Sequence, residues 1–144
     1  MAFFREKAGF RILEHPADMG IEAYGANLGE AFEQAAMALT SIILDPSNIE
    51  HRESRIIELS ASDHEHLLVK WLADVLYLYD GQDFVGKRFE IRDLSPSHMR
   101  AEIFGEPFDP KKHKTRMDVK AITYHQILVE ETPAGGRVRV YLDI

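Results

Sequence analysis

The chain contains no cysteine. This absence excludes a disulfide framework, a thiolate zinc site and a cysteine nucleophile, and with them several secreted and catalytic classes. Basic residues are also scarce, because 17 Lys and Arg stand against 24 Asp and Glu and give a formal net charge of −7. Nucleic-acid-binding proteins usually carry a basic surplus on one face, so we expect any RNA role to run through a partner protein.

Long apolar runs are missing as well. No uninterrupted stretch approaches the roughly 18 residues of a membrane span, and the mean hydropathy of −0.25 agrees. Residues 1–7 mix both charge signs and lack the apolar segment of a secretory signal. These absences predict a cytoplasmic protein that does not insert into a membrane.

The common catalytic motifs are absent too. The chain has no phosphate-binding loop, no dinucleotide-binding glycine pattern and no nucleophile elbow. Its seven histidines form no recognised metal-ligand spacing, and we expect most of them, His113 included, at the surface. His64 and His66 lie two positions apart on a predicted helix, where they would point away from each other. With no repeat, linker or low-complexity tract, and with 45% hydrophobic residues, residues 1–144 are expected to form a single domain.

Two helices are predicted from capping signals and apolar spacing. Asn27 with Glu30 forms a capping signature that starts a helix at Leu28, which should end before Asp45. The second helix should follow Asp63 and close at Gly81, since glycine adopts the left-handed conformation without a Cβ clash. Each helix carries one apolar stripe, consisting of Leu28, Phe32, Ala35, Ala36, Leu39, Ile42 and Ile43 in the first and Leu67, Leu68, Trp71, Leu72, Val75, Leu76 and Tyr79 in the second.

The remaining apolar segments read as strands, with a hairpin connection over residues 133–136. We expect them at residues 10–14, 19–24, 55–60, 84–92, 98–104, 117–121, 124–130 and 138–142. The fold class is therefore α/β of the α+β type, with two layers in which a mixed β-sheet is covered by two amphipathic helices.

Acidic groups near a strand connection and at the chain end could bind a hard cation. Asp18 follows a loop between two predicted strands, and Asp143 stands next to Ile144, whose carboxylate adds a second anionic group. Together these oxygens suit Ca²⁺, Mg²⁺ or Mn²⁺. The alternatives are an Asx turn at Asp18, which composition alone favours, and a frayed acidic terminus at Asp143.

The second half of the chain holds two more polar features. Lys120 either extends its ammonium into water or contacts a carboxylate or phosphate, while Tyr124 and His125 are expected as core rings with satisfied polar tips. Residues 111–116 form the one basic run, and Asp109-Pro110 before it indicates a loop. The default interpretation of such a basic run is a loop exposed to solvent. Its alternative is a docking patch for an acidic protein surface or an RNA backbone, with steep salt dependence.

Several motifs occurring together resemble the archease family. They are His15-Pro16-Ala17-Asp18-Met19-Gly20-Ile21-Glu22-Ala23-Tyr24-Gly25, residues 28–32, residues 67–72, Gly105-Glu106, Lys120-Ala121-Ile122-Thr123-Tyr124-His125 and the closing Asp143-Ile144. The resemblance covers nearly the whole chain. It departs at Pro16, where many relatives are expected to have a small hydroxyl residue, and this puts a side-chain hydrogen bond beside the site in doubt.

The resemblance implies a two-layer α/β fold and an accessory factor, not an enzyme in its own right. Such a factor promotes guanylylation and repeated turnover of an RtcB-type RNA ligase in tRNA splicing or RNA repair, so RNA is met only indirectly. It also implies a divalent metal at Asp18, Asp143 and Ile144, with Lys120 contributing to the activating surface. We expect Ca²⁺ there in isolation and Mn²⁺ or Mg²⁺ in function.

Two other functions remain open at this point. A chaperone or adaptor that modulates an RNA-modifying enzyme such as a tRNA methyltransferase would act through surface contacts and would need no metal. A stand-alone metal-dependent hydrolase is disfavoured, because no positioned base or nucleophile accompanies the carboxylates.

Overall fold

The computed structural model describes residues 8–14 and 18–144, which form two long helices and seven strands. The helices are α1 (Leu28–Ile43) and α2 (His64–Gln82), and a short 3₁₀ turn spans Pro46–Asn48. The strands are β1 (Gly9–Glu14), β2 (Met19–Gly25), β3 (Glu53–Ser60), β4 (Phe84–Leu94), β5 (His98–Pro107), β6 (Ala121–Thr132) and β7 (Gly135–Asp143). In this part of the chain neither helix has the length and apolar character needed to cross a membrane.

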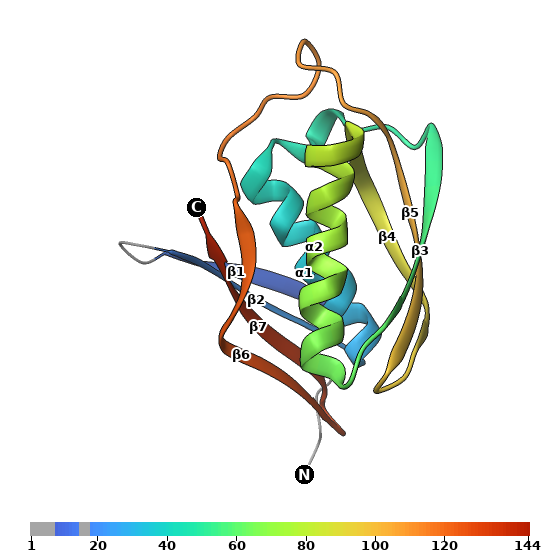
Figure 1. Cartoon of the computed structure of the whole chain (residues 1–144), viewed down its shortest axis with the longest axis vertical. Coiled ribbons are helices and arrows are strands. Elements are labelled where there is room, and N and C mark those ends of the chain that lie inside the picture. The colour runs from blue at the N-terminus through green and yellow to red at the C-terminus, as the bar shows by residue number, and fades with distance from the viewer. Residues whose placement is uncertain (1–7, 15–17) are drawn as a thin grey trace.

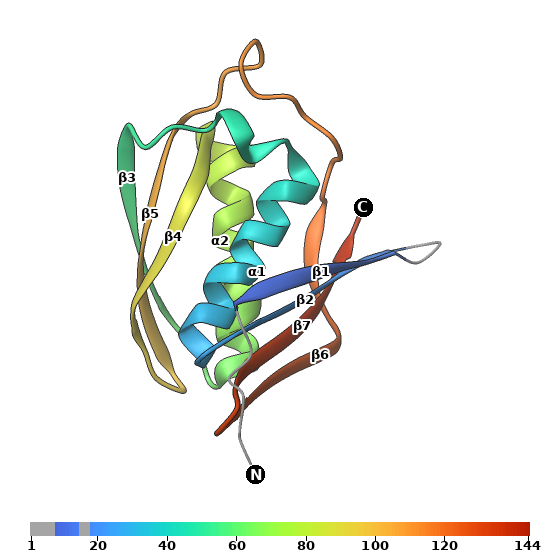
Figure 2. The same cartoon turned by 180° about the vertical axis from the view of Figure 1, so that it is seen from behind.

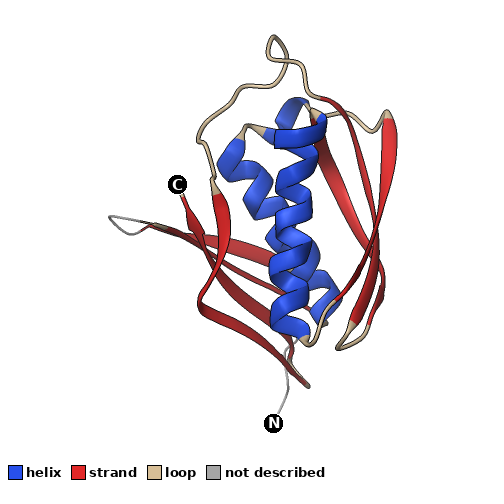
Figure 3. Cartoon of the chain, in the orientation of Figure 1, coloured by secondary structure: helices blue, strands red, loops and turns tan. Residues whose placement is uncertain are grey.

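The strands form two separate sheets. One has the order β1-β2-β7-β6 and the other β3-β5-β4, and every strand pairing in the described residues is antiparallel. Both helices lie between the two sheets (Figures 1 and 3). The predicted α+β class with two packed helices is confirmed. The expected single sheet is divided in two, so the helices are covered on two sides.

Helix α1 starts as its capping signals predict. The Asn27 side chain accepts a hydrogen bond from the Glu30 backbone N–H at 2.9 Å, and the Glu30 carboxylate accepts one from the Ala26 N–H at 3.1 Å. Alanines as well as the larger residues of this helix are buried, including Ala31 and Ala38. Because α1 contacts strands of both sheets (Figure 2), small residues let the backbone pack closely on each side.

Helix α2 packs its predicted stripe into the core but ends later than expected. The buried Trp71 indole donates a hydrogen bond to the Phe32 carbonyl of α1 at 2.9 Å. The predicted stop at Gly81 is wrong, because the helix continues to Gln82 and Asp83 takes the left-handed conformation at φ 50°. Aspartate tolerates this conformation better than most residues, so it replaces glycine as the terminating residue.

Residues 108–120 join β5 to β6, and we call this segment the strap. Figure 1 shows it in orange, rising above the helices and descending to the start of β6. The predicted strand at residues 117–121 is wrong, since only Ala121 belongs to a strand. The N–H groups of Arg116 and Met117 instead donate to the Ile43 carbonyl at the end of α1, at 2.8 and 3.3 Å. The strap thus satisfies a helix carbonyl that would otherwise lack a partner.

Candidate functional site

Asp18 and Asp143, which were predicted as metal ligands, lie where β2 begins and β7 ends. Met19 pairs with Leu142 in the antiparallel register, which places Asp18 and Asp143 at the same end of the two strands. Lys120 joins them from the strap, because its N–H donates to the Asp143 carbonyl at 2.8 Å. Figure 1 shows the C-terminus beside the start of β6. We call Asp18, Asp143 and Ile144 the acidic end.

Asp18 carries the clearest chemical signal of this end. Its Oδ1 atom is buried and has no hydrogen-bond partner within the described part of the chain. An Asx turn through this oxygen is therefore not observed among these residues. The other residues of the motif, 15–17 with Pro16 among them, lie outside the described residues. A buried carboxylate oxygen without a donor costs free energy of folding, and a bound cation would offset that cost.

Asp143 is held in a strand and is not part of a frayed tail. It is the last residue of β7, which lies between β2 and β6, and it pairs with Ala121. Its side chain is exposed, and Ile144 after it is 37% exposed. Strand pairing on both sides therefore presents the end of β7 in a fixed position while leaving the Asp143 carboxylate open to solvent.

The donor chemistry of the acidic end fits a hard divalent cation. Carboxylate oxygens are the ligands that Ca²⁺, Mg²⁺ and Mn²⁺ prefer, and the Asp18 oxygen has no competing partner within the described residues. In residues 8–14 and 18–144, no three His, Cys, Asp or Glu side chains are gathered as a metal centre. A site here would accordingly have two aspartates and would need further oxygen ligands.

Tyr124 and His125 lie on β6, a few residues after Lys120 of the strap. The prediction that they are core rings is wrong. A wide bulge interrupts the pairing of β6 with β7 between Thr123 and Leu128, and Gln126 within it has φ 49°. Tyr124 is 50% exposed, and its ring lies 5.1 Å from that of His66 on α2. The apolar spacing of β6 could not predict this, because a bulge shifts which face each residue occupies.

A second polar cluster lies where β5 ends and the strap begins. It was not predicted as a site from the sequence. Glu106 is 2% exposed and accepts hydrogen bonds from the His113 ring at 2.8 Å, the Lys112 ammonium at 2.9 Å and the Glu50 N–H at 2.9 Å. His113 is 1% exposed, so its predicted surface position is wrong. The Asp109 N–H donates to His113 Nδ1 at 2.9 Å, which leaves Nε2 to donate to Glu106. We call Glu106, Lys112 and His113 the clasp.

The clasp keeps its carboxylate ionised. Burial acts to raise the pKa of Glu106, but hydrogen bonds from Glu50, His113 and Lys112 outweigh it and lower the pKa from 4.5 to about 2. The dipeptide Gly105-Glu106 of the family motif was the one sequence signal for this cluster. Its partners lie on the strap and before β3, so spacing alone could not indicate them.

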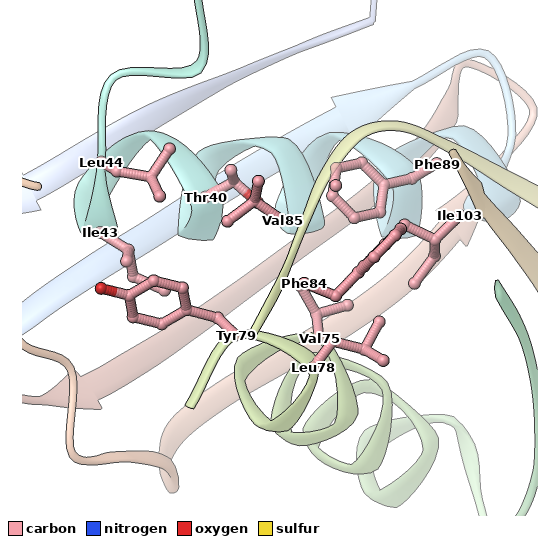
Figure 4. A pocket seen from close by; sticks show the side chains of 11 residues that line it. Thr40, Ile43, Leu44, Val75, Leu78, Tyr79, Phe84, Val85, Phe89 and Ile103 are labelled. Atoms are coloured by element: carbon pink, nitrogen blue, oxygen red, sulfur yellow. The ribbon is translucent and has the colours of Figure 1, made fainter. Parts of the chain in front are cut away.

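Two hollows lined by described residues lie away from the acidic end. Figure 4 shows one between α1, α2 and the three-stranded sheet, lined by apolar side chains such as Ile43, Phe84 and Phe89. Its volume of about 10 Å³ is at the limit for a single water. A wider hollow of about 450 Å³ opens at the start of α1, but there the Glu131 carboxylate already accepts the Leu28 N–H at 3.0 Å. Neither offers a built ligand site.

The fold and the acidic end together define a class of protein. It is a small α+β domain with two helices between antiparallel sheets and with aspartates at the paired ends of β2 and β7. The sequence model of the Archease protein family (MTH1598/TM1083) matches residues 10–144. The chain therefore belongs to the archease family, as the sequence motifs indicated.

Individual relatives agree with this membership. The chain is 38% identical over 136 residues to protein archease of Sulfolobus acidocaldarius, covering 94% of this chain and 98% of that protein. It is 40% identical over 125 residues to protein archease of Pyrococcus furiosus, covering 85% and 88% of the two chains.

Two solved structures share the fold. The solution structure of Methanobacterium thermoautotrophicum protein 1598 matches with a TM-score of 0.78 and 30% identity, covering 94% of this chain and 99% of that one. The crystal structure of a Thermotoga maritima archease, described as a possible chaperone, matches with a TM-score of 0.59 and 18% identity over 100% of both chains. The second likeness concerns the fold alone.

Proposed function

We propose that this protein is a cytoplasmic accessory factor that activates an RtcB-type RNA ligase. It promotes guanylylation of the ligase and repeated turnover in tRNA splicing or RNA repair, and it meets RNA only through the ligase. Membership of the archease family supports this class of role. The observation that carries the proposal is the buried oxygen of Asp18, which has no partner in the described part of the chain and lies at the same strand ends as the exposed Asp143.

In this proposal Asp18, Asp143 and the Ile144 carboxylate hold a divalent cation, which supplies positive charge that can offset the negative charge of phosphate groups. Asp18 contributes an oxygen that has no donor among residues 8–14 and 18–144. Asp143 contributes a carboxylate at a fixed strand end, where β6 and β2 flank β7. Lys120 is exposed and tied to the same end through its backbone, so its ammonium adds a cationic contact to the activating surface.

The protein acts on the geometry and charge of its partner's site and does not supply a nucleophile. Nucleotidyl transfer depends on positioning and on stabilisation of developing charge, so an activator has only to improve these. An adaptor for an RNA-modifying enzyme such as a tRNA methyltransferase is the alternative. That adaptor would act through surface contacts alone and would tolerate a chelator.

Guanylylation of a cognate RtcB-type ligase tests the proposal. The ligase is incubated with GTP and limiting divalent metal, with untagged wild-type protein, Asp143→Ala, Asp93→Ala or no addition. Asp93 is a matched control, because its carboxylate is exposed on β4, which belongs to the other sheet. We expect wild type and Asp93→Ala to accelerate guanylylation and Asp143→Ala to leave it near the background rate.

Two results would contradict parts of the proposal. Equal acceleration by Asp143→Ala and wild type would show that the acidic end is dispensable and would favour the adaptor. No acceleration by any of the proteins would show that ligase activation is the wrong function.

A further inference from the structure

The strap is irregular in conformation yet firmly attached to the rest of the molecule. Thr115 forms an isolated β-bridge with Leu44, and the Asp45 N–H donates to the Lys114 carbonyl at 2.9 Å. The Arg116 guanidinium donates to the Ser41 carbonyl at 2.9 Å. Long connections without secondary structure are uncommon in compact domains and are usually functional or disordered. The strap is ordered by these bonds, so its conformation needs a functional explanation.

The clasp fixes the first half of the strap. Its buried hydrogen bonds join Glu106, at the end of β5, to Lys112 and His113. The His113 ring also stacks on Phe108 at 5.7 Å, and Phe108 packs edge-on against Tyr79 of α2 at 5.3 Å. Charge-assisted and buried, these contacts hold the strap in one conformation before any partner arrives.

The strap carries positive charges that the molecule does not neutralise. In residues 8–14 and 18–144, the lysine side chains without a hydrogen bond or ion pair are those of Lys111, Lys114 and Lys120, and all three are exposed. Lys114 acts on Asp45 only at longer range, as one cause of the lowered pKa of that carboxyl after the hydrogen bonds from Ser47. The other described lysines and arginines all have contacts, namely Arg11, Arg52, Arg55, Lys70, Lys87, Arg88, Arg92, Arg100, Lys112, Arg116, Arg137 and Arg139.

The surroundings of these lysines favour a protein partner over a nucleic acid. Asp109 and Asp118 stand among them on the strap, and Asp118 acts on Asp80 of α2, where burial and this neighbouring charge raise the pKa of Asp80. A continuous phosphate backbone following the strap would pass these carboxylates on a molecule of net charge −7. A discrete acidic patch can meet the lysines and avoid the aspartates.

We propose that the strap is a preorganised docking surface for an acidic patch on a protein partner, with Lys111 and Lys114 as its contacts. The surface is continuous with the acidic end, because the strap ends at Lys120 and its hydrogen bond to Asp143. This proposal rests on the proposed function, in which that partner is the RNA ligase. Docking through the strap would then bring the acidic end to the ligase in a fixed orientation.

Binding measured at low and at high salt tests the docking surface. The double variant Lys111→Gln/Lys114→Gln is compared with Lys70→Gln/Arg100→Gln, which removes the same charge from α2 and β5. We expect the strap variant to bind a cognate RtcB-type ligase about tenfold more weakly at low salt, with a flatter salt dependence. The control variant should bind like wild type. Both variants are first checked by thermal unfolding, which the strap substitutions should not change because neither lysine side chain has a hydrogen bond or ion pair with the described residues.

The other outcomes separate the two proposals. If the strap variant binds the ligase as tightly as the control does, the docking surface is wrong while ligase activation stands. If wild-type protein does not bind the ligase at any salt concentration, both proposals are wrong. A single-stranded polyuridine oligonucleotide provides the third arm. Salt-dependent binding of this RNA that is lost in the strap variant would overturn the protein partner in favour of RNA.

Discussion

At the scale of single residues, two carboxylates of this protein differ in whether their buried oxygens have hydrogen-bond donors. Glu106 is buried with both oxygens engaged by donors, whereas Asp18 has a buried oxygen with no donor in the described residues. The first arrangement stabilises the native state, because charge-assisted hydrogen bonds compensate the cost of burial. The second lowers stability in the absence of a ligand. A loss of stability of this kind is typical of a residue retained for binding.

We predict that Glu106→Gln lowers the free energy of unfolding by about 2–3 kcal/mol at neutral pH. The amide has a single acceptor oxygen, and its NH₂ group would face the donors of Lys112 and His113. Urea denaturation measures the loss. The matched control is Glu102→Gln on the same strand, whose carboxylate is only half-buried and bonds to Arg92. That substitution should cost far less, and an equal loss in both variants would contradict the structural role of the clasp.

The same carboxylate predicts a pH dependence. The pKa of Glu106 is lowered from 4.5 to about 2 in the folded protein, so the unfolded chain binds more protons between these values. The stabilisation is complete above pH 4.5 and is lost as the pH falls toward 2. The difference in unfolding free energy between wild type and Glu106→Gln should therefore shrink over this interval. A constant difference would show that the clasp does not depend on the charge.

Sequence reasoning at this scale succeeded where a signal is local. Asn27 and Glu30 cap α1 as predicted, since both partners lie within one turn. It failed for His113, whose burial depends on Glu106 and on the distant ring of Tyr79 through Phe108. Polar residues in a loop usually face solvent, and nothing nearby in the sequence indicates that this loop folds back over the core.

At the scale of elements, helix ends illustrate how physical rules compete. Gly81 had the residue type of a helix stop, but the left-handed residue is Asp83. Its N–H donates to the Leu78 carbonyl, and its own carbonyl accepts the Phe108 N–H at 2.6 Å. The contact with the strap therefore fixes the end of α2, and local glycine chemistry does not.

We predict that Asp83→Gly raises the free energy of unfolding by about 0.5 kcal/mol, because glycine adopts positive φ without the Cβ penalty. The backbone bonds at this position do not involve the aspartate side chain. Ala73→Gly, at an exposed position within α2, should instead lower the free energy of unfolding by about 1 kcal/mol. Chemical denaturation of both variants checks the opposite signs. A loss of stability in Asp83→Gly would show that the aspartate side chain itself is needed at the helix end.

The apolar alternation of residues 117–121 shows why one strand was wrongly predicted. Val119 is buried and Met117 packs against the core, as in a strand, but the backbone of this stretch bonds to the end of α1 and to β7. Burial of alternate residues sets the pattern in either case. Only the bonding partner distinguishes a strand from a strap, and the partner lies outside the segment.

At the scale of the whole molecule, the acidic end depends on strand pairings between distant parts of the chain. Asp18 and Asp143 lie at the same strand ends because β2 pairs with β7, and Lys120 lies beside Asp143 because β6 pairs with β7 as well. Hydrophobic periodicity predicts that strands exist but not which strands pair, and so it could not predict two sheets in place of one. The resemblance to the archease family supplied the grouping of these residues, and strand register supplies its physical basis.

Thermal unfolding with and without Ca²⁺ tests the metal-binding role of the acidic end most directly. Without metal, Asp18→Ala should melt about 3 °C above wild type, because it removes a buried oxygen that has no donor among the described residues, worth about 1 kcal/mol. With Ca²⁺ at about 100 times its dissociation constant, wild type and Asp93→Ala should gain about 2.7 kcal/mol. Asp18→Ala and Asp143→Ala should gain nothing. Equal stabilisation of all four proteins by Ca²⁺ would show that the acidic end is not the metal site.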